Sequence, residues 1–542
     1  MDSQRPPQPP IDDPDMLAPA TEGLQGGPPV KMKHPAGLWV LFITEMWERF
    51  SYYGMRAILV LYLVASTSEA LADGAPNNNP GFGWQEESAY LLYGIYTWAV
   101  YLTPIFGGLL ADKLLGTHRS MLIGGWIIAL GHITLALSEL FGAPAGQVVT
   151  MQSGPGELLV FLLGLAFIVI GTGFFKPCVS VMVGQLYERG DPRRDSGFTI
   201  FYMGINLGAF FSPLIAGTLG EKVGWHWGFG SAAVGMIAGL FFYQMFRPKY
   251  LKGIGLPPGH TDAASGSGDD EEIVVCEQCE CDVRHVPAGA PCPECGAETR
   301  VETTKRALFN RPLKVRDWHR LGVIIILAFF GNIFFWTAFE QAGSSMNVFA
   351  KDQTDRTIWG MVGGEGFPAS WYQSVNPLAI LIFAPVFAWL WVFLTRIGKN
   401  PSTPMKFAIG LYLLGLAFLA MVFGAMEAKD GLAGPHWLLI TYVVITWGEL
   451  CLSPVGLSMV TKLAPARLQS LMMGLWFFSF SLSNLFAGLV ARFSVKVEEG
   501  DWTFFIPGLP GFFLMLVVFP IAAGVIIMLV TPLLKKMMHG VK

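Results

Sequence analysis

Four ionisable side chains lie inside the first apolar stretch of the chain, in the sequence EMWERFSYYGMR at residues 45–56. They are Glu45, Glu48, Arg49 and Arg56, and the flanking stretches GLWVLFIT and AILVLYLV carry no charge. Each charged side chain at the centre of a membrane-spanning helix costs about 2.5–3.5 kcal/mol on insertion scales, so such residues seldom face lipid. Acids and bases held together in this way could bind a charged solute or exchange a proton.

Helical periodicity places these charges on one side of the predicted helix. At 100° per residue, positions 45, 48, 49, 52, 53 and 56 fall within an arc of about 140°. One interpretation is that Glu45 pairs with Arg49 at i,i+4 and that the charges only hold the helices together. Because ionisable residues inside membranes usually mark substrate or proton pathways, we favour a functional face, which also carries Tyr52 and Tyr53.

Three more ionisable residues lie deep within other apolar segments. They are Lys176 in GTGFFKPCVS, Glu340 in FFWTAFEQAGSS and Glu449 in ITWGELCLSPVG. A cavity lined by these side chains suits a zwitterion, because fixed cations would hold a carboxylate and a fixed acid would hold an ammonium group. A further acid could carry a proton, since its affinity for the proton changes as its partners come and go.

The whole chain has the composition of a membrane protein. Of its 542 residues 52% are apolar and 14% are charged, whereas soluble domains have about 25% charged residues. A helix needs about 20 residues to cross the hydrocarbon core. We therefore predict an all-α membrane protein with twelve transmembrane helices. The predicted spans are about 37–66, 86–112, 119–141, 156–184, 194–220, 225–247, 318–350, 371–397, 402–427, 435–464, 468–494 and 509–535.

Lys and Arg are concentrated in alternate connections between these segments, for example at Lys113 and Arg119 and again at Arg193 and Arg194. Two of the opposite connections, SEALADGAPNNNPGFGWQEES and GAPAGQVVTMQSGPGE, contain no basic residue. Basic loops tend to stay in the cytoplasm. Both termini are therefore expected to be cytoplasmic, in a multi-pass protein of a plasma or inner membrane.

A polar stretch of 70 residues separates the first six predicted helices from the last six. TPIFGGLL in the second helix is weakly similar to APVFAWLW in the eighth. Two parallel six-helix repeats around a central cavity are typical of one large class of secondary transporters. The expected parts are a disordered cytoplasmic tail at 1–36, a six-helix bundle at 37–247, a cytoplasmic linker at 248–317, a second six-helix bundle at 318–535 and a short cytoplasmic tail at 536–542.

Several of these motifs together resemble one transporter family. EMWERFSYYG matches the ExxERFxYYG signature of the proton-dependent oligopeptide transporter (POT/PTR) family, within the major facilitator superfamily. GGLLADKLLGTHR, GTGFFKPCVS, FTIFYMGINLGAFFSP, FWTAFEQAGSS, YQSVNPL and WGELCLSPVGLSMVTKLAP also resemble segments of that family. The resemblance covers about 35–247 and 318–535.

The resemblance implies a symporter that imports di- and tripeptides with protons by alternating access. Arg56 and Lys176 would hold the peptide carboxylate, and Glu449, Asn206 and Asn376 would hold its amino terminus. The other substrate-binding residues that it implies are Tyr53, Tyr101, Trp336, Ser453 and Trp476.

The same resemblance implies the route of the proton. Glu45, Glu48 and Arg49 would form a coupling cluster with Lys176, and Glu340 would exchange salt-bridge partners with Arg56 or Lys176 across the two halves. The family's KPN motif is replaced by Lys-Pro-Cys at 176–178, which changes only the local hydrogen bonding. Mammalian relatives have a histidine in the second helix, whereas this chain has none between 86 and 112, so coupling must rest on carboxylates.

Five of the seven cysteines lie in the linker. Cys276, Cys279, Cys292 and Cys295 have the spacing C-x2-C-x12-C-x2-C, in which two tight turns each supply two thiolates to one tetrahedral metal. We predict a zinc ribbon at about 273–300, with iron as the alternative metal. A reducing cytoplasm disfavours disulfides, and the acidic flanks disfavour nucleic acid as a partner.

Other functions remain as alternatives. A relative of the same family could carry nitrate or another small solute, although an acid for an ammonium group favours peptides. The metal motif raises a second alternative, a metal-regulated membrane sensor built on a transporter fold. An enzyme is not expected, because the sequence has no nucleophile elbow, phosphate-binding loop or histidine metal site. Peptides and the lipid bilayer are the expected partners, and no obligate protein partner is evident.

Overall fold

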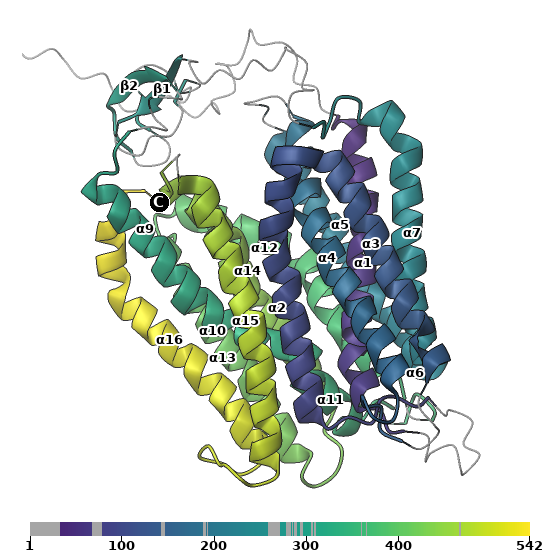
Figure 1. The fold of residues 1–542 in the computed structure, drawn as a ribbon. Coiled ribbons are helices and arrows are strands. Elements are labelled where there is room, and N and C mark those ends of the chain that lie inside the picture. Colours follow the sequence, from purple (N-terminus) through teal and green to yellow (C-terminus); the bar gives the residue numbers. More distant parts are fainter. Residues whose placement is uncertain are drawn as a thin grey trace, which may run out of the picture.

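Long helices account for most of the chain in this computed structural model (Figure 1). The residues that the structure describes are 33–67, 79–142, 147–187, 191, 193–257, 272–277, 283–284, 286, 290–292, 296–304, 307, 311–358, 360–364, 366–465 and 468–541.

A first helix group is formed by the part of the chain before the two strands. Its helices are α1 (Ala36–Val64), α2 (Glu86–Leu110), α3 (Thr117–Leu137), α4 (Pro155–Gln185), α5 (Arg194–Ser212), α6 (Thr218–Lys222) and α7 (Trp225–Tyr250). Short π and 3-10 turns extend several of them, namely η4 (Ala111–Leu115), η5 (Ser138–Phe141) and η6 (Pro213–Gly217). In this group α1 packs on α5 and α7, and α4 packs between α2 and α3.

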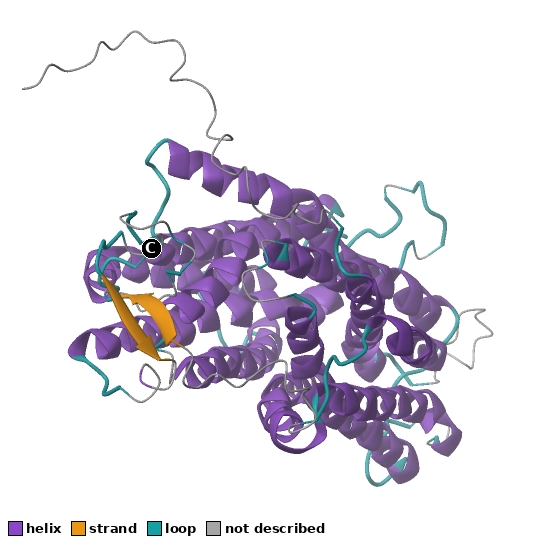
Figure 2. Cartoon of the chain, turned by 90° about the horizontal axis from the view of Figure 1, so that it is seen from above, coloured by secondary structure: helices purple, strands orange, loops and turns teal. Residues whose placement is uncertain are grey.

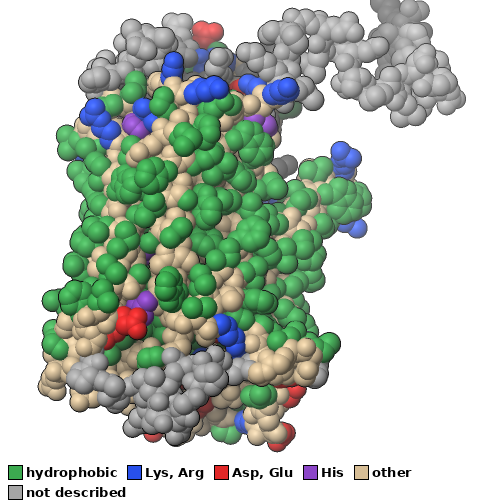
Figure 3. Space-filling view, turned by 90° about the vertical axis from the view of Figure 1, so that its right-hand side faces the viewer, with side chains coloured by type: hydrophobic (Ala, Val, Ile, Leu, Met, Phe, Trp, Pro, Cys, Tyr) green, Lys and Arg blue, Asp and Glu red, His purple; other side chains and the backbone are tan. Residues whose placement is uncertain are grey.

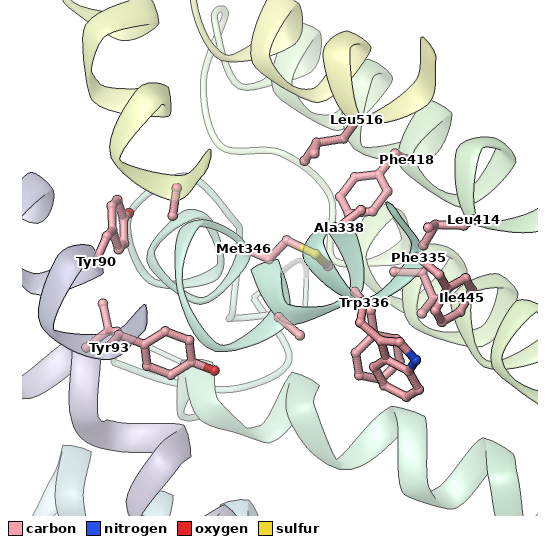
Figure 4. Packing of buried hydrophobic residues seen from close by; sticks show 14 of the residues in the cluster. Tyr90, Tyr93, Phe335, Trp336, Ala338, Met346, Leu414, Phe418, Ile445 and Leu516 are labelled. Atoms are coloured by element: carbon pink, nitrogen blue, oxygen red, sulfur yellow. The ribbon is translucent and has the colours of Figure 1, made fainter. Parts of the chain in front are cut away.

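A second helix group follows the strands. Its helices are α9 (Val315–Ile326), α10 (Ile333–Phe339), α11 (Ser345–Asp352), α12 (Val375–Arg396), α13 (Thr403–Glu427), α14 (His436–Leu463), α15 (Gln469–Glu498) and α16 (Leu509–Met537). Non-α turns lie at η7 (Leu327–Asn332), η8 (Glu340–Gly343) and η9 (Ala369–Ser374). Here α13 packs against α14 and α16, and α10 against α15. The buried hydrophobic residues of α10 meet those of α13 and α14, as seen for Phe335, Leu414 and Ile445 in Figure 4.

Eleven helical segments in the described chain are long and apolar enough to cross a membrane. The remaining predicted span, the first one at 37–66, corresponds to α1, which has 29 residues but is not among the eleven. Its sequence includes Glu45, Glu48, Arg49 and Arg56, which lower its mean hydropathy. The structure buries all four side chains, so these charges do not meet the lipid. The predicted reason for tolerating them, protein surroundings instead of lipid, is confirmed.

The outer surface suits a bilayer. Figure 3 shows hydrophobic side chains over the broad middle of one face, with Lys and Arg gathered toward the end where the strands lie. Large apolar side chains are exposed on both groups, for example Val234 and Phe241 on α7 and Trp389 and Leu529 on α12 and α16. Exposed apolar surface on this scale is a liability in water and is normal in lipid.

Strands β1 (Glu272–Cys276) and β2 (Arg300–Thr304) form an antiparallel pair in which Cys276 lies opposite Arg300. Figure 2 shows the pair over one end of the helices, close to the C-terminus. A hydrogen bond links it to the second helix group, because Nη1 of Arg316 in α9 donates to the carbonyl oxygen of Glu277 at 3.0 Å.

The two groups meet most closely where α2 packs on α15. A Cβ atom added to Gly488 would lie 2.6 Å from Cα of Gly94 and 2.7 Å from the carbonyl oxygen of Tyr90. Both contacts are with backbone, which cannot rotate away. Glycine is therefore required at Gly488 by the approach of the two helices, although α-helices generally prefer alanine.

We predict that Gly488→Ala lowers the thermal unfolding midpoint in detergent, because overpacking of a close contact costs about 1–3 kcal/mol. Gly474 on the same helix is the matched control, since an added Cβ there would meet nothing within 4 Å. Gly474→Ala should leave the midpoint unchanged or raise it slightly. Equal midpoints for the two variants would contradict the close approach of α2 and α15.

Candidate functional site

A cavity lies between the two helix groups. Its walls come from α1, α2 and α5 on one side and from α10, η8, α12, α14 and α15 on the other. It contains about 1190 Å³ of empty space, including its open mouth. Nine of the predicted site residues line it, namely Tyr53, Arg56, Tyr101, Asn206, Trp336, Glu340, Asn376, Glu449 and Ser453.

An ion pair crosses this cavity from one helix group to the other. Nη2 of Arg56 in α1 lies 2.5 Å from Oε2 of Glu340, the first residue of η8. The Tyr93 hydroxyl on α2 accepts a hydrogen bond of 2.7 Å from Nε of Arg56 and lies 3.4 Å from the same Glu340 oxygen. The three side chains are buried, so the pair is poorly screened by water. Removing one partner of such a pair typically costs about 3–5 kcal/mol.

Glu449 is the acid on the opposite wall of the cavity. One of its oxygens accepts a hydrogen bond of 2.9 Å from Nδ2 of Asn376, which also donates to Oγ1 of Thr446 at 2.9 Å. No Lys or Arg within the described ranges forms an ion pair with this carboxylate. The amide therefore orients Glu449, and this acid remains available to pair with a cationic group in the cavity.

The other three charged residues of α1 form a separate cluster that does not line the cavity. Nε of Arg49 lies 3.1 Å from Oε1 of Glu45 and is also paired with Oε2 of Glu48. The second oxygen of Glu48 and one Nη of Arg49 have no hydrogen-bond partner among the residues described. The cluster is therefore incompletely paired, and a water molecule or a proton could complete it.

Lys176 was predicted to touch both the substrate and this cluster. It is not a lining residue; instead its Nζ lies 3.6 Å from the centre of the Tyr101 ring, which does line the cavity. In the described part of the chain no carboxylate lies within ion-pair distance of Lys176. The ring face of Tyr101 stabilises the ammonium group through a cation–π interaction. Lys176 thus reaches the cavity wall through Tyr101.

Aromatic rings form much of the remaining wall. Tyr101 stacks on Phe480 with an interplanar angle of 15°, and Trp336 contacts the same Phe480 ring at 5.0 Å between centroids. Trp476, also predicted to bind substrate, does not line the cavity and is only 1% exposed. It packs behind Phe480 against Gly456, where the missing side chain leaves room for the indole ring.

Some residues of the site were not predicted. Tyr93 lies behind the cavity wall and contacts both members of the ion pair, and Tyr202, Tyr442 and Gln373 line the wall. Figure 4 shows the Tyr93 ring pointing from α2 toward the second helix group, to which Ala338 of α10 and Met346 of α11 belong. The sequence signal was a run of tyrosines on an otherwise apolar helix, which gives the polar face but not its partners.

Only part of the predicted metal site can be compared with the structure. Cys279 and Cys295 lie outside the described residues, whereas Cys276 and Cys292 are buried in one small cluster with Val283. In the described chain no group of three or more His, Cys, Asp or Glu residues could hold a metal ion. The N–H of Gly296 donates to the carbonyl oxygen of Cys292 at 2.8 Å.

The chain has relatives in both sequence and structure. The peptide transporter YePEPT of Yersinia enterocolitica is 38% identical, with 93% of this chain and 95% of that protein covered. The uncharacterized transporter YclF of Bacillus subtilis is 39% identical, with 94% and 96% covered. A di-/tripeptide transporter of Lactococcus lactis is 34% identical, with 94% and 97% covered.

A crystal structure of peptide transporter POT in complex with sulfate is also similar, with a TM-score of 0.71 and 34% identity over 94% of this chain and 97% of that one. The family model PTR2, described as the POT family, matches residues 118–257 and 296–505. The chain therefore belongs to the POT family of transporters.

Proposed function

We propose that this protein is a proton-coupled symporter that carries di- and tripeptides across a plasma membrane by alternating access. One observation supports this more than any other. The cavity between the helix groups holds a cation on one wall, Arg56, and on the other an acid with no basic partner in the described chain, Glu449. Proton coupling is general in the POT family, and two of the relatives are named peptide or di-/tripeptide transporters.

The two helix groups would be the two halves that rock around this cavity. Residues 37–247 and 318–535 are the proposed six-helix bundles. With α1 added to the eleven apolar spans, the proposed total is twelve. The basic loops, the linker and both termini are proposed to be cytoplasmic, because Lys and Arg gather at the end of the molecule near the strands (Figure 3).

A short peptide would lie between the two walls. Its carboxylate would bind Arg56 of α1 as a charge-assisted pair. Its ammonium group would bind Glu449, with Asn376 and Asn206 donating or accepting hydrogen bonds beside it. Contacts to both ends of the substrate limit its length and leave its side chains free.

The side chains of the peptide would meet the aromatic wall. Tyr53, Tyr101, Trp336 and Phe480 offer large faces with few directional requirements. Ser453 adds a hydroxyl to the same wall. Lys176 would join the carboxylate site only if the Tyr101 ring turned aside, and Trp476 would support the wall from behind.

Proton coupling would act through Glu340. In this structure Glu340 is the partner of Arg56, so a peptide carboxylate must compete with it for the same guanidinium group. Once displaced, a carboxylate in this buried position is stabilised by binding a proton. The ion pair between the two groups is then broken, and the groups can separate. Glu45, Glu48, Arg49 and Lys176 are proposed to pass the proton in the first helix group.

The alternative of nitrate or another small anion fits the cavity less well. An anion would be attracted to Arg56 but would make no use of Glu449, an acid with no basic partner in the described chain. A zwitterion uses both groups. The sensor alternative has no specific support from the cavity.

We expect Glu340→Gln to abolish proton-driven accumulation of a labelled dipeptide in proteoliposomes, because an amide cannot take up the proton. Counterflow should persist, since exchange of peptide for peptide needs no net proton release. Glu157→Gln is a suitable control, because Glu157 is buried, accepts a hydrogen bond from Tyr62 and does not line the cavity. A Glu340→Gln protein that still concentrated peptide would contradict the proposed coupling.

Glu449→Gln should raise the KM for a free dipeptide about ten-fold or more, because a hydrogen bond between charged groups typically contributes about 1.5–3 kcal/mol. The inhibition constant of an N-acetylated dipeptide, a weak competitor, should not change. This ligand has no ammonium group that Glu449 could bind. The measurement is the inhibition constant of each compound against labelled dipeptide uptake. An equal loss for both ligands would show that Glu449 does not bind the amino terminus.

A structural zinc ion is a second proposal, for the linker. Cys276 and Cys292 share one buried cluster, and the backbone of Cys292 forms hydrogen bonds with Gly296 and Ala297. Gly296 has a φ of +77°, which a tight turn after two ligands requires. These features fit a cysteine-ligated knuckle, with Cys279 and Cys295 supplying the other two thiolates. The metal would contribute the folding energy that a module this small lacks.

Purified protein should contain one zinc ion per chain, measured by plasma mass spectrometry. Cys276→Ser and Cys292→Ser should each lose most of it, because a tetrahedral site cannot close with three thiolates as tightly as with four. Cys451→Ser is the matched control, since Cys451 is buried in α14. Coloured protein containing iron would favour the alternative metal, and metal-free protein would refute the site.

A further inference from the structure

Both carboxylate oxygens of Glu221 in α6 accept hydrogen bonds from the second helix group. Its Oε2 accepts a hydrogen bond of 2.8 Å from the backbone N–H of Ala369, and its Oε1 accepts one of 2.9 Å from the backbone N–H of Ser370. Ala369 and Ser370 are the first two residues of η9, which leads directly into α12. Their N–H groups have no acceptor within their own helix, because they begin it.

Two more hydrogen bonds join the helix groups near Glu221. Nε1 of Trp371 donates to Oγ1 of Thr218 at 2.9 Å, and Oγ of Ser374 donates to the carbonyl oxygen of Phe210 at 2.8 Å. Ser370 is fully buried against η6. A Cβ atom added to Gly217 in η6 would lie 2.0 Å from Oγ of Ser370. The two helix groups are therefore in close contact around Glu221, where η6 packs on η9.

The contact lies at the end of the molecule opposite the strands. Figure 1 shows α6 and α11 at that end and β1 and β2 at the other. Another hydrogen bond also joins the two groups. Nδ2 of Asn347 in α11 donates to the carbonyl oxygen of Ala57 in α1 at 2.8 Å. With the strand end in the cytoplasm, the Glu221 contact closes the cavity on the outer side.

We propose that Glu221 is the latch that holds the outer side of the cavity closed and that must release before the cavity can accept solute from outside. This inference rests on the proposed alternating access. The latch consists of the Glu221 carboxylate on the N–H groups of Ala369 and Ser370. Its acceptors and donors lie on opposite helix groups, so any outward opening breaks both hydrogen bonds together. Water can then solvate the carboxylate and the amides, which makes the release reversible.

The latch differs from the Arg56–Glu340 pair in its partners. Glu221 binds backbone amides, which any residue except proline supplies, whereas Arg56 and Glu340 bind through side chains that a substrate or proton can compete for. Glu221 does not line the cavity. Its contribution is therefore to the position of the two groups and not to the binding of solute.

Two variants weaken the latch from opposite sides. Glu221→Gln keeps the length of the side chain, but its NH2 group faces a backbone donor, so at least one hydrogen bond is lost. Ala369→Pro removes one donor and leaves the carboxylate intact. Proline is favoured at the first position of a helix, and the extended backbone of the preceding Pro368, with ψ of 136°, accommodates it.

Glu427→Gln is the matched control. Glu427 also uses both oxygens, accepting from the N–H of Gly434 and from Nε1 of Trp437, but all three residues belong to the second helix group. Loss of this charge alters no contact between the groups. The control therefore separates the latch from a general effect of replacing a glutamate that accepts two hydrogen bonds.

The readout is the reaction of a cavity cysteine with a membrane-impermeant thiol reagent. Ala209 lines the cavity, so Ala209→Cys reports whether the cavity is open. The reagent is added to right-side-out membrane vesicles without peptide or a proton gradient. The chain without Ala209→Cys measures the background from the native cysteines.

Glu221→Gln and Ala369→Pro should each raise the outside rate of labelling about ten-fold or more, because each loses a hydrogen bond to a charged group. The double variant should add little to either single variant, since both act on one contact. Glu427→Gln should react like the parent. In inside-out vesicles the two latch variants should react more slowly than the parent.

Unchanged outside labelling in both latch variants would overturn the proposal, as would an equal rise in Glu427→Gln. A cysteine at position 209 that reacted from neither side would also overturn it, because the latch presumes a cavity that water reaches. Labelling involves no peptide and no proton gradient. A chain that failed to transport peptide but showed the expected labelling would therefore refute the proposed substrate and leave the latch in place.

Discussion

The ion pair between Arg56 and Glu340 is the interaction on which the rest of the structure depends. It joins α1 to η8 across the cavity and is buried with the Tyr93 hydroxyl beside it. A buried pair is stable only while both partners remain, because either charge alone would be poorly solvated. Whatever binds one partner therefore changes the state of the other. The helices around the pair hold it in a place where a solute can reach it.

The walls of the cavity combine ionisable residues with aromatic residues, and the two kinds have different roles. Glu449 forms no ion pair with a described basic residue, and Asn376 fixes its direction. The aromatic rings, among them Phe480 and Trp336, offer a large contact area with few directional requirements. Fixed charges at the ends and adaptable surface between them suit a class of substrates that share their termini and differ in their side chains.

Sequence alone predicted the features that follow from transfer free energy and from motifs, and it missed several that depend on tertiary packing or on backbone partners. The buried charges of α1 were predictable because lipid excludes them. The burial of Trp476 behind Phe480 was not, because both residues lie on one face of α15 and only the tertiary packing separates them. The partners of Glu221 are backbone amides, which leave no mark in the sequence. The spans were located well, although the charges of α1 set it apart from the eleven apolar ones.

The competition between a peptide carboxylate and Glu340 for Arg56 can be tested most directly by calorimetric titration of the purified protein with a dipeptide in buffers of different ionisation enthalpy. The slope of the observed enthalpy against the buffer enthalpy gives the number of protons exchanged on binding. We expect an uptake of protons from the buffer, because the displaced Glu340 carboxylate binds one. Binding with the same enthalpy in every buffer, and hence with no proton uptake, would contradict it.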